Sequence, residues 1–191
     1  DRFAAEFAAV HGVEFPDVDY YDDTALYMDH STGDFLNITL HDGTWEYWIS
    51  DSIAPVLDVP PQDVSEEFLR ETLDNFGFSV PADTAFTLSP YGETSYRAVF
   101  SADLLPTEGG FLHGTLTCVL DAQDDGKAEL SRLENRITAL APVREEPILS
   151  PAQALAALQA GKSFDGAWFA QSAQQIEVRS CTLDYLSDSK G

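Results

Sequence analysis

The stretch from Phe3 to Pro16 reads FAAEFAAVHGVEFP, and the stretch from Phe68 to Pro81, which lies 65 residues later, reads FLRETLDNFGFSVP. Identical residues fall at four matched positions, Phe3/Phe68, Glu6/Glu71, Gly12/Gly77 and Pro16/Pro81. Each copy has the apolar spacing of a short helix, a glycine that ends it, and an extended segment that closes with proline. Because strand-like sequence follows both copies, the repeat predicts units in which a helix packs on a sheet.

The segments after each helix predict antiparallel meanders. After the first copy we expect an acidic loop at 17–23 and strands at 24–28, 35–40 and 44–49, with a hairpin turn at Asp42-Gly43. After the second copy we expect strands at 84–89, 94–104, 112–121 and 127–140, with glycine-containing turns between them. The run KAELSRLENRI in the last of these also fits a helix, but the turn before it favours a strand.

A third helix is expected from Ser150, the N-cap, to Gly161, followed by a strand at 174–186. The fold class we predict is therefore α+β, built from repeated units of a helix packed on an antiparallel β-meander. The proline-rich stretch 53–61 reads as a linker. The expected units are 1–62, 63–149 and a truncated C-terminal unit at 150–191.

Charge narrows the classes of partner. The 191 residues carry 33 acidic and 10 basic side chains, a formal net charge of -23. Such a chain repels nucleic-acid phosphates and anionic lipid headgroups, so we expect neither as a partner. A solvated anionic surface explains the charge, and a basic partner is the sharper alternative. Oxygen ligands for a cation are available in the cluster Asp17, Asp19, Asp22 and Asp23, although turn chemistry explains other acidic segments better.

No catalytic motif is visible, so we expect a protein that is not an enzyme and that holds no cofactor or metal. The four histidines are scattered, and HExxH, GxSxG, P-loop and GxGxxG patterns are absent. A hydrolase that uses scattered carboxylates remains an alternative. Cys118 and Cys181 lie in strand-like runs, which favours buried free thiols and leaves a disulfide between neighbouring strands open.

Trp45, Tyr47 and Trp48 crowd one expected strand. Alternation places Trp45 and Tyr47 on one face and Trp48 on the other. Core packing is the main interpretation of this cluster. If their face is exposed, Trp45 and Tyr47 form an interaction surface, because aromatic side chains are enriched at interfaces.

The third unit reads EPILSPAQALAALQAG at 146–161 and IEVRSCTLDY at 176–185. These segments resemble the C-terminal part of YycH/YycI-type extracytoplasmic regulatory proteins of Gram-positive bacteria, and the helix-then-strand theme is similar to PepSY-like modules. Residues 4–16 resemble the segment that follows the membrane helix of such proteins. The resemblance transfers no site residues.

The resemblance implies a non-enzymatic regulator outside the cytoplasm, tethered by an N-terminal anchor upstream of Asp1. Its partner would be a membrane protein, either the sensor kinase of a two-component system or a paralogous regulator. The alternatives are a secreted binding module for a glycan or small ligand, with Trp45 and Tyr47 as its platform, and a PepSY-like protease inhibitor.

Overall fold

The computed structural model describes residues 2–140, and Ser150, Ala152, Gln153 and Ala156 beyond them. Two compact units divide the chain, at residues 1–141 and 142–191. In the second unit the Gln153 amide donates to Ser150 Oγ at 3.3 Å, so Ser150 is the N-cap that the sequence predicts. The rest of the expected third helix and the strand at 174–186 lie outside the described residues.

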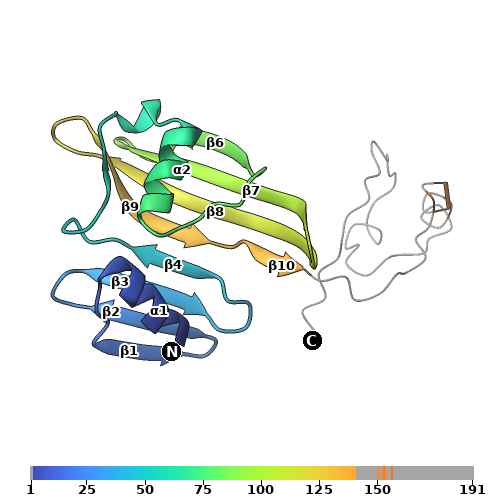
Figure 1. Ribbon diagram of the computed structural model, residues 1–191, viewed down its shortest axis with the longest axis horizontal. Coiled ribbons are helices and arrows are strands. Elements are labelled where there is room, and N and C mark those ends of the chain that lie inside the picture. Colours follow the sequence, from blue (N-terminus) through green and yellow to red (C-terminus); the bar gives the residue numbers. More distant parts are fainter. Residues whose placement is uncertain (1, 141–149, 151, 154–155, 157–191) are drawn as a thin grey trace, which may run out of the picture. The chain divides into compact units, whose positions relative to one another are not determined.

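The first unit is an α+β structure with antiparallel strands, as predicted (Figure 1). Its elements are α1 (Arg2–His11), β1 (Asp17–Tyr21), β2 (Thr24–Asp29), β3 (Asp34–Thr39), β4 (Trp45–Trp48), β5 (Val56–Leu57), the 3-10 turn η1 (Pro61–Asp63), α2 (Glu66–Asn75), β6 (Ala85–Pro90), β7 (Ser95–Thr107), β8 (Gly110–Ala122), β9 (Ala128–Asn135) and β10 (Thr138–Leu140). None of the described helices has the length and apolar character needed to span a membrane.

All the described strands belong to one ten-stranded sheet. Its main path runs β1-β2-β3-β4-β9-β8-β7-β6, while β5 pairs with β9 and β10 pairs with β8. The last strands of the two expected meanders, β4 and β9, pair with Tyr47 opposite Leu133. The described residues of the units expected at 1–62 and 63–149 therefore lie in one continuous sheet and one compact unit. The expected linker contributes β5 to that sheet.

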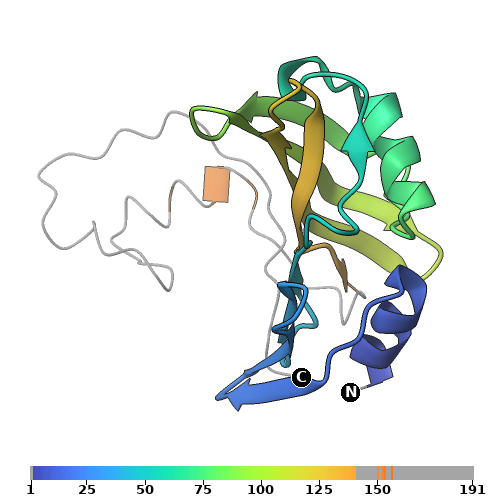
Figure 2. The ribbon, with the colours of Figure 1, turned by 90° about the vertical axis from the view of Figure 1, so that its left-hand side faces the viewer.

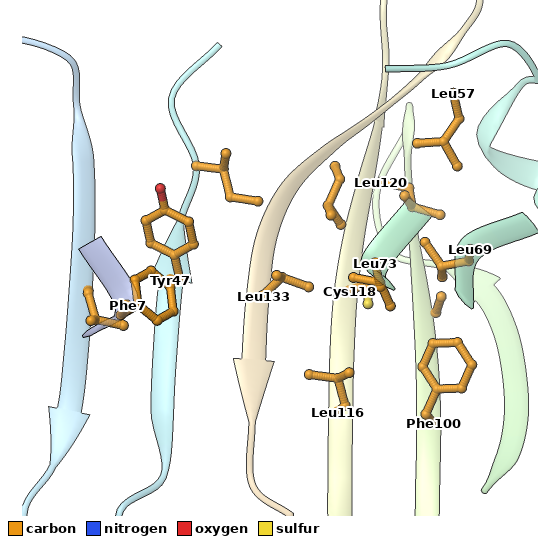
Figure 3. Close-up of a cluster of buried hydrophobic side chains, with 14 of the residues drawn as sticks. Phe7, Tyr47, Leu57, Leu69, Leu73, Phe100, Leu116, Cys118, Leu120 and Leu133 are labelled. Atoms are coloured by element: carbon orange, nitrogen blue, oxygen red, sulfur yellow. The ribbon is translucent and has the colours of Figure 1, made fainter. Parts of the chain in front are cut away.

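Both helices lie on the same side of the sheet (Figure 2). The core forms between them and the strands, where Leu69 and Leu73 of α2 are fully buried near Leu120 and Cys118 of β8 (Figure 3). We call the helix-covered surface of the sheet the helix face and the opposite surface the open face. Side chains alternate between these two faces along each strand.

Both helices end at a glycine in the left-handed region, as the repeat predicts. Gly12 has φ of +67° and Gly77 has φ of +91°. The amide of Val13 donates to the Ala8 carbonyl at 3.1 Å, and the amide of Phe78 donates to the Leu73 carbonyl at 2.8 Å. This is the Schellman pattern, which glycine favours because it lacks a Cβ.

Two expectations about strands need correction or refinement. The acidic loop expected at 17–23 is wrong, because 17–21 form β1, whose Tyr21 pairs with Thr24 across a two-residue turn. Asp22 in that turn has φ of +44°, which aspartate tolerates better than most residues. The ambiguous run after residue 127 is a strand, as expected, but it breaks after Asn135 into β9 and β10.

Candidate functional site

Trp45 and Tyr47 share the helix face, as alternation predicts. Tyr47 has no exposed surface and Trp45 is half-buried. The Phe7 ring of α1 meets both edge-on, with centroids 4.8 Å from Tyr47 and 5.6 Å from Trp45. The helix therefore packs against this face: Tyr47 is a core residue, whereas Trp45 packs on Phe7 and keeps part of its surface exposed.

The Tyr47 hydroxyl belongs to a buried polar network around Asp34. It donates to Asp34 Oδ1 at 2.9 Å, while the Ser50 amide donates to the same oxygen at 3.0 Å and Ser50 Oγ donates to Oδ2 at 2.7 Å. Burial, followed by the neighbouring Asp34 carboxylate, raises the pKa of Tyr47. A buried carboxylate with three donors ties β3 to the end of β4, which is a structural role.

On the open face, Trp48 lies at the centre of a stack that crosses three strands. Its partners in register are Phe35 on β3 and Arg132 on β9. The Phe35 ring stacks on the indole with centroids 5.2 Å apart and planes at 22°, and Arg132 Cζ lies 4.7 Å from the indole centroid. Because β4 lies between β3 and β9, these two neighbours flank the indole on opposite sides.

The stack continues toward β7 through Tyr91. Arg132 Nη2 donates to the Tyr91 hydroxyl at 3.1 Å, and Arg97 Cζ lies 5.4 Å from the centroid of the Tyr91 ring. Val119 of β8 separates the two arginines in register and is only 6% exposed. We call Phe35, Trp48, Arg132, Tyr91 and Arg97 together the aromatic–arginine row.

The two arginines of the row differ in their partners. Arg132 Nη1 lies 3.3 Å from Glu46 Oε1, also on the open face. Four more of the described lysines and arginines also have a carboxylate within 4.0 Å; these are Arg2, Arg70, Lys127 and Arg136. One described arginine is the exception. Arg97 is that exception: it is exposed and has no ion pair within the described residues.

A shallow polar hollow of about 470 Å³ adjoins the row where β4, β9 and β10 diverge. Asn37, Glu46, Glu134 and Arg136 contribute to its lining. Its carboxylates face no serine or cysteine nucleophile among the lining residues, and Glu134 is already paired with Arg136. The hollow therefore adds polar side chains at the border of the row.

The four aspartates considered as an alternative cation site do not converge in the described part of the chain. Asp17 and Asp19 lie on β1, whereas Asp22 and Asp23 form the turn that follows. Between residues 2 and 140, no three histidine, cysteine or acidic side chains are placed to hold a metal ion. Exposed His41 lies 3.2 Å from Asp23, which accounts for one of these carboxylates.

Cys118 is a free and fully buried thiol on the helix face, and burial raises its pKa. The thiolate is the reactive form of cysteine, so this side chain packs as a small apolar group. Cys181 lies outside the described residues.

Sequence reasoning missed the aromatic–arginine row as a unit. Alternation separates Trp48 from Trp45 and Tyr47, but no local pattern connects it with Arg132 or Tyr91. No family model matches the chain, and neither a curated protein nor a solved structure matches it.

Proposed function

We propose that this chain is a non-enzymatic protein-interaction domain that docks a protein partner on the open face of its sheet, through the aromatic–arginine row. Tryptophan, tyrosine and arginine are the residue types enriched at interface hot spots. Here they gather on a face that no described helix covers, with Trp48 40% and Tyr91 49% exposed. This concentration of anchor side chains is the observation that carries the proposal.

The partner we propose is a membrane protein of a sensor system, either a kinase or a paralogous regulator, met outside the cytoplasm. The YycH/YycI-type resemblance of 146–161 and 176–185 supports this assignment. The net charge of -23 attracts a basic surface at long range and repels nucleic acid.

A glycan-binding module receives less support from the open face. Sugars bind aromatic platforms by lying on an exposed ring face. Both sides of the Trp48 indole are already occupied, by Phe35 and by Arg132. The PepSY-like inhibitor alternative names no site residue. An inhibition assay against a panel of proteases distinguishes it from the docking proposal.

We also propose that the two halves of the sheet are copies of one unit, a helix followed by four strands, related by a pseudo-two-fold axis between β4 and β9. The matched Schellman ends at Gly12 and Gly77 support it. So does the contact between His11 and Phe76, which are equivalent at an offset of 65 and have ring centroids 4.8 Å apart. A two-fold axis brings equivalent residues together in this way.

The test uses the intact chain and the extracytoplasmic domains of sensor kinases encoded near its gene. We expect binding by at least one, with Trp48→Ala and Tyr91→Ala each weakening it about 10-fold or more. Tyr20→Ala is the matched control, because this exposed tyrosine lies on β1 on the helix-face side, opposite buried Ala25. The proposal would be overturned if Trp48→Ala and Tyr91→Ala bound the kinase domain as tightly as wild type. It would also be overturned if glycans, and no protein partner, bound and quenched the tryptophan fluorescence.

A further inference from the structure

We infer that Arg97 is the point at which the row receives a carboxylate from the partner, an inference that rests on the proposed docking function. The partner we infer is a protein that presents a segment in which an aspartate or glutamate lies next to an apolar residue. Among the described residues, Arg97 is the one arginine that has no ion pair, and it is exposed.

An arginine that has no ion pair among the described residues is unexpected in so acidic a chain. There are 33 acidic residues against 10 basic ones, and every other described lysine or arginine lies within 4.0 Å of a carboxylate. A nearby carboxylate has another partner: Asp121, two residues from Val119 along β8, accepts a hydrogen bond from Ser95 Oγ. The described residues therefore include carboxylates on the open face, such as Glu46, and none of them forms an ion pair with Arg97.

Tyr91 holds Arg97 in place without consuming its hydrogen-bond donors. The guanidinium lies over the tyrosine ring at 5.4 Å, and the ring is fixed from its other end because Arg132 donates to the hydroxyl. A stacked guanidinium keeps its in-plane N–H groups free, and those groups match the two oxygens of a carboxylate. Preorganisation of this kind lowers the entropic cost of forming the contact.

The surroundings select a single carboxylate with an apolar neighbour. Tyr91 beside Arg97 and Trp48 beside Arg132 are both partly exposed aromatic residues. A polyanion is disfavoured, because the net charge of -23 repels it at long range while Arg97 attracts it only at short range. A protein that is basic or neutral overall can approach and still present one acidic side chain.

The probe is a phage-displayed library of random short peptides, panned on the intact chain and counter-screened on Trp48→Ala. We expect the selected peptides to share an aspartate or glutamate next to an apolar residue. Arg97→Gln should raise their Kd about 10-fold or more, and Arg97→Lys should restore part of the loss, because lysine keeps the charge but not the planar fork. Arg2→Gln on α1 is the matched control, since Arg2 is exposed and paired with Glu6.

A peptide in which asparagine or glutamine replaces the acidic residue should lose the same factor, and should lose nothing further against Arg97→Gln. Peptides that depend on Trp48 but bind Arg97→Gln and wild type equally would overturn the carboxylate inference and leave the docking function standing. Failure to select any Trp48-dependent peptide would overturn both. Unchanged thermal unfolding of Arg97→Gln shows that an affinity loss is not a folding defect.

Discussion

His11 lies at the end of α1 among three phenylalanine rings. The centroid distances are 4.4 Å to Phe7, 4.5 Å to Phe78 and 4.8 Å to Phe76. Its Nδ1 atom is buried and has no hydrogen-bond partner. Desolvation lowers the pKa of His11 from 6.5 to about 4, so the imidazole is neutral in the folded chain at physiological pH. The contact between the two helices thus contains a histidine whose protonation at acidic pH would destabilise the folded chain.

The sign of the resulting pH dependence follows from linkage. Since the unfolded chain takes up this proton near pH 6.5 and the folded chain only near pH 4, His11 lowers the free energy of unfolding as pH falls between those values. We expect the free energy of unfolding of His11→Phe, relative to that of wild type, to rise by about 2 kcal/mol as the pH is lowered from about 7.5 to about 4.5. Urea unfolding at each pH measures this difference. His30→Phe, at an exposed site, is the control. Parallel pH profiles for wild type and His11→Phe would contradict the prediction.

The pairing of β8 with β9 places two carboxylates opposite each other, Asp121 on β8 and Glu129 on β9. Burial, followed by Asp51 and Asp121, raises the pKa of Glu129. Because the carboxyl pKa is raised in the folded chain, ionisation of Glu129 at neutral pH lowers the free energy of unfolding. This loss disappears as the pH falls through the raised pKa and the group is protonated. We expect Glu129→Gln to raise the free energy of unfolding by about 0.2–1 kcal/mol at pH 7, and this gain to vanish in acid.

Glu134→Gln provides the contrast, because Glu134 also faces a carboxylate, Glu46, but is paired with Arg136. It should not stabilise the chain. Thermal melts of both variants at neutral and acidic pH measure the difference. A destabilised Glu129→Gln at pH 7 would show that Glu129 has a favourable partner.

The two helix ends predict unequal costs for the same substitution. A Cβ at Gly12 would meet nothing within 4 Å, whereas a Cβ at Gly77 would lie 2.6 Å from Val10 Cγ1. Gly12→Ala should cost about 1–2 kcal/mol of unfolding free energy from left-handed strain alone, and Gly77→Ala should cost more. Adding Val10→Ala should recover the difference for Gly77→Ala and leave Gly12→Ala unchanged, as chemical denaturation would measure. Equal costs at both glycines would refute the steric argument.

At the level of elements, local chemistry made much of the first unit predictable. Gly12 and Gly77 end their helices where expected because the left-handed stop is a one-residue requirement. The strand at 17–21 was missed because its acidic residues suggest a loop, although Val18 and Tyr20 alternate with Asp17 and Asp19. The strand forms because β2 offers it a complementary edge, and that pairing outweighs the charge.

At the scale of the whole unit, the pairing of β4 with β9 decides what sequence reasoning could not. That pairing joins the two meanders into one sheet and places Trp48 beside Arg132, 84 residues later. Alternation assigns Trp45 and Trp48 to opposite faces, but the helices decide which face is covered. The candidate surface is therefore a product of non-local contacts, and the tight hairpins alone do not encode it.

Charge is a property of the whole chain and supports the last prediction. A net charge of -23 opposes compaction by self-repulsion, and salt screens it. We expect Tm to rise when NaCl increases from about 10 mM to about 500 mM, because the ion pairs within residues 2–140 are too few and too exposed to reverse the effect. CaCl2 at matched ionic strength should give the same shift, since no three ligands converge within residues 2–140. An additional, saturable calcium shift that Asp17→Asn or Asp23→Asn removes would contradict this and establish a cation site at β1.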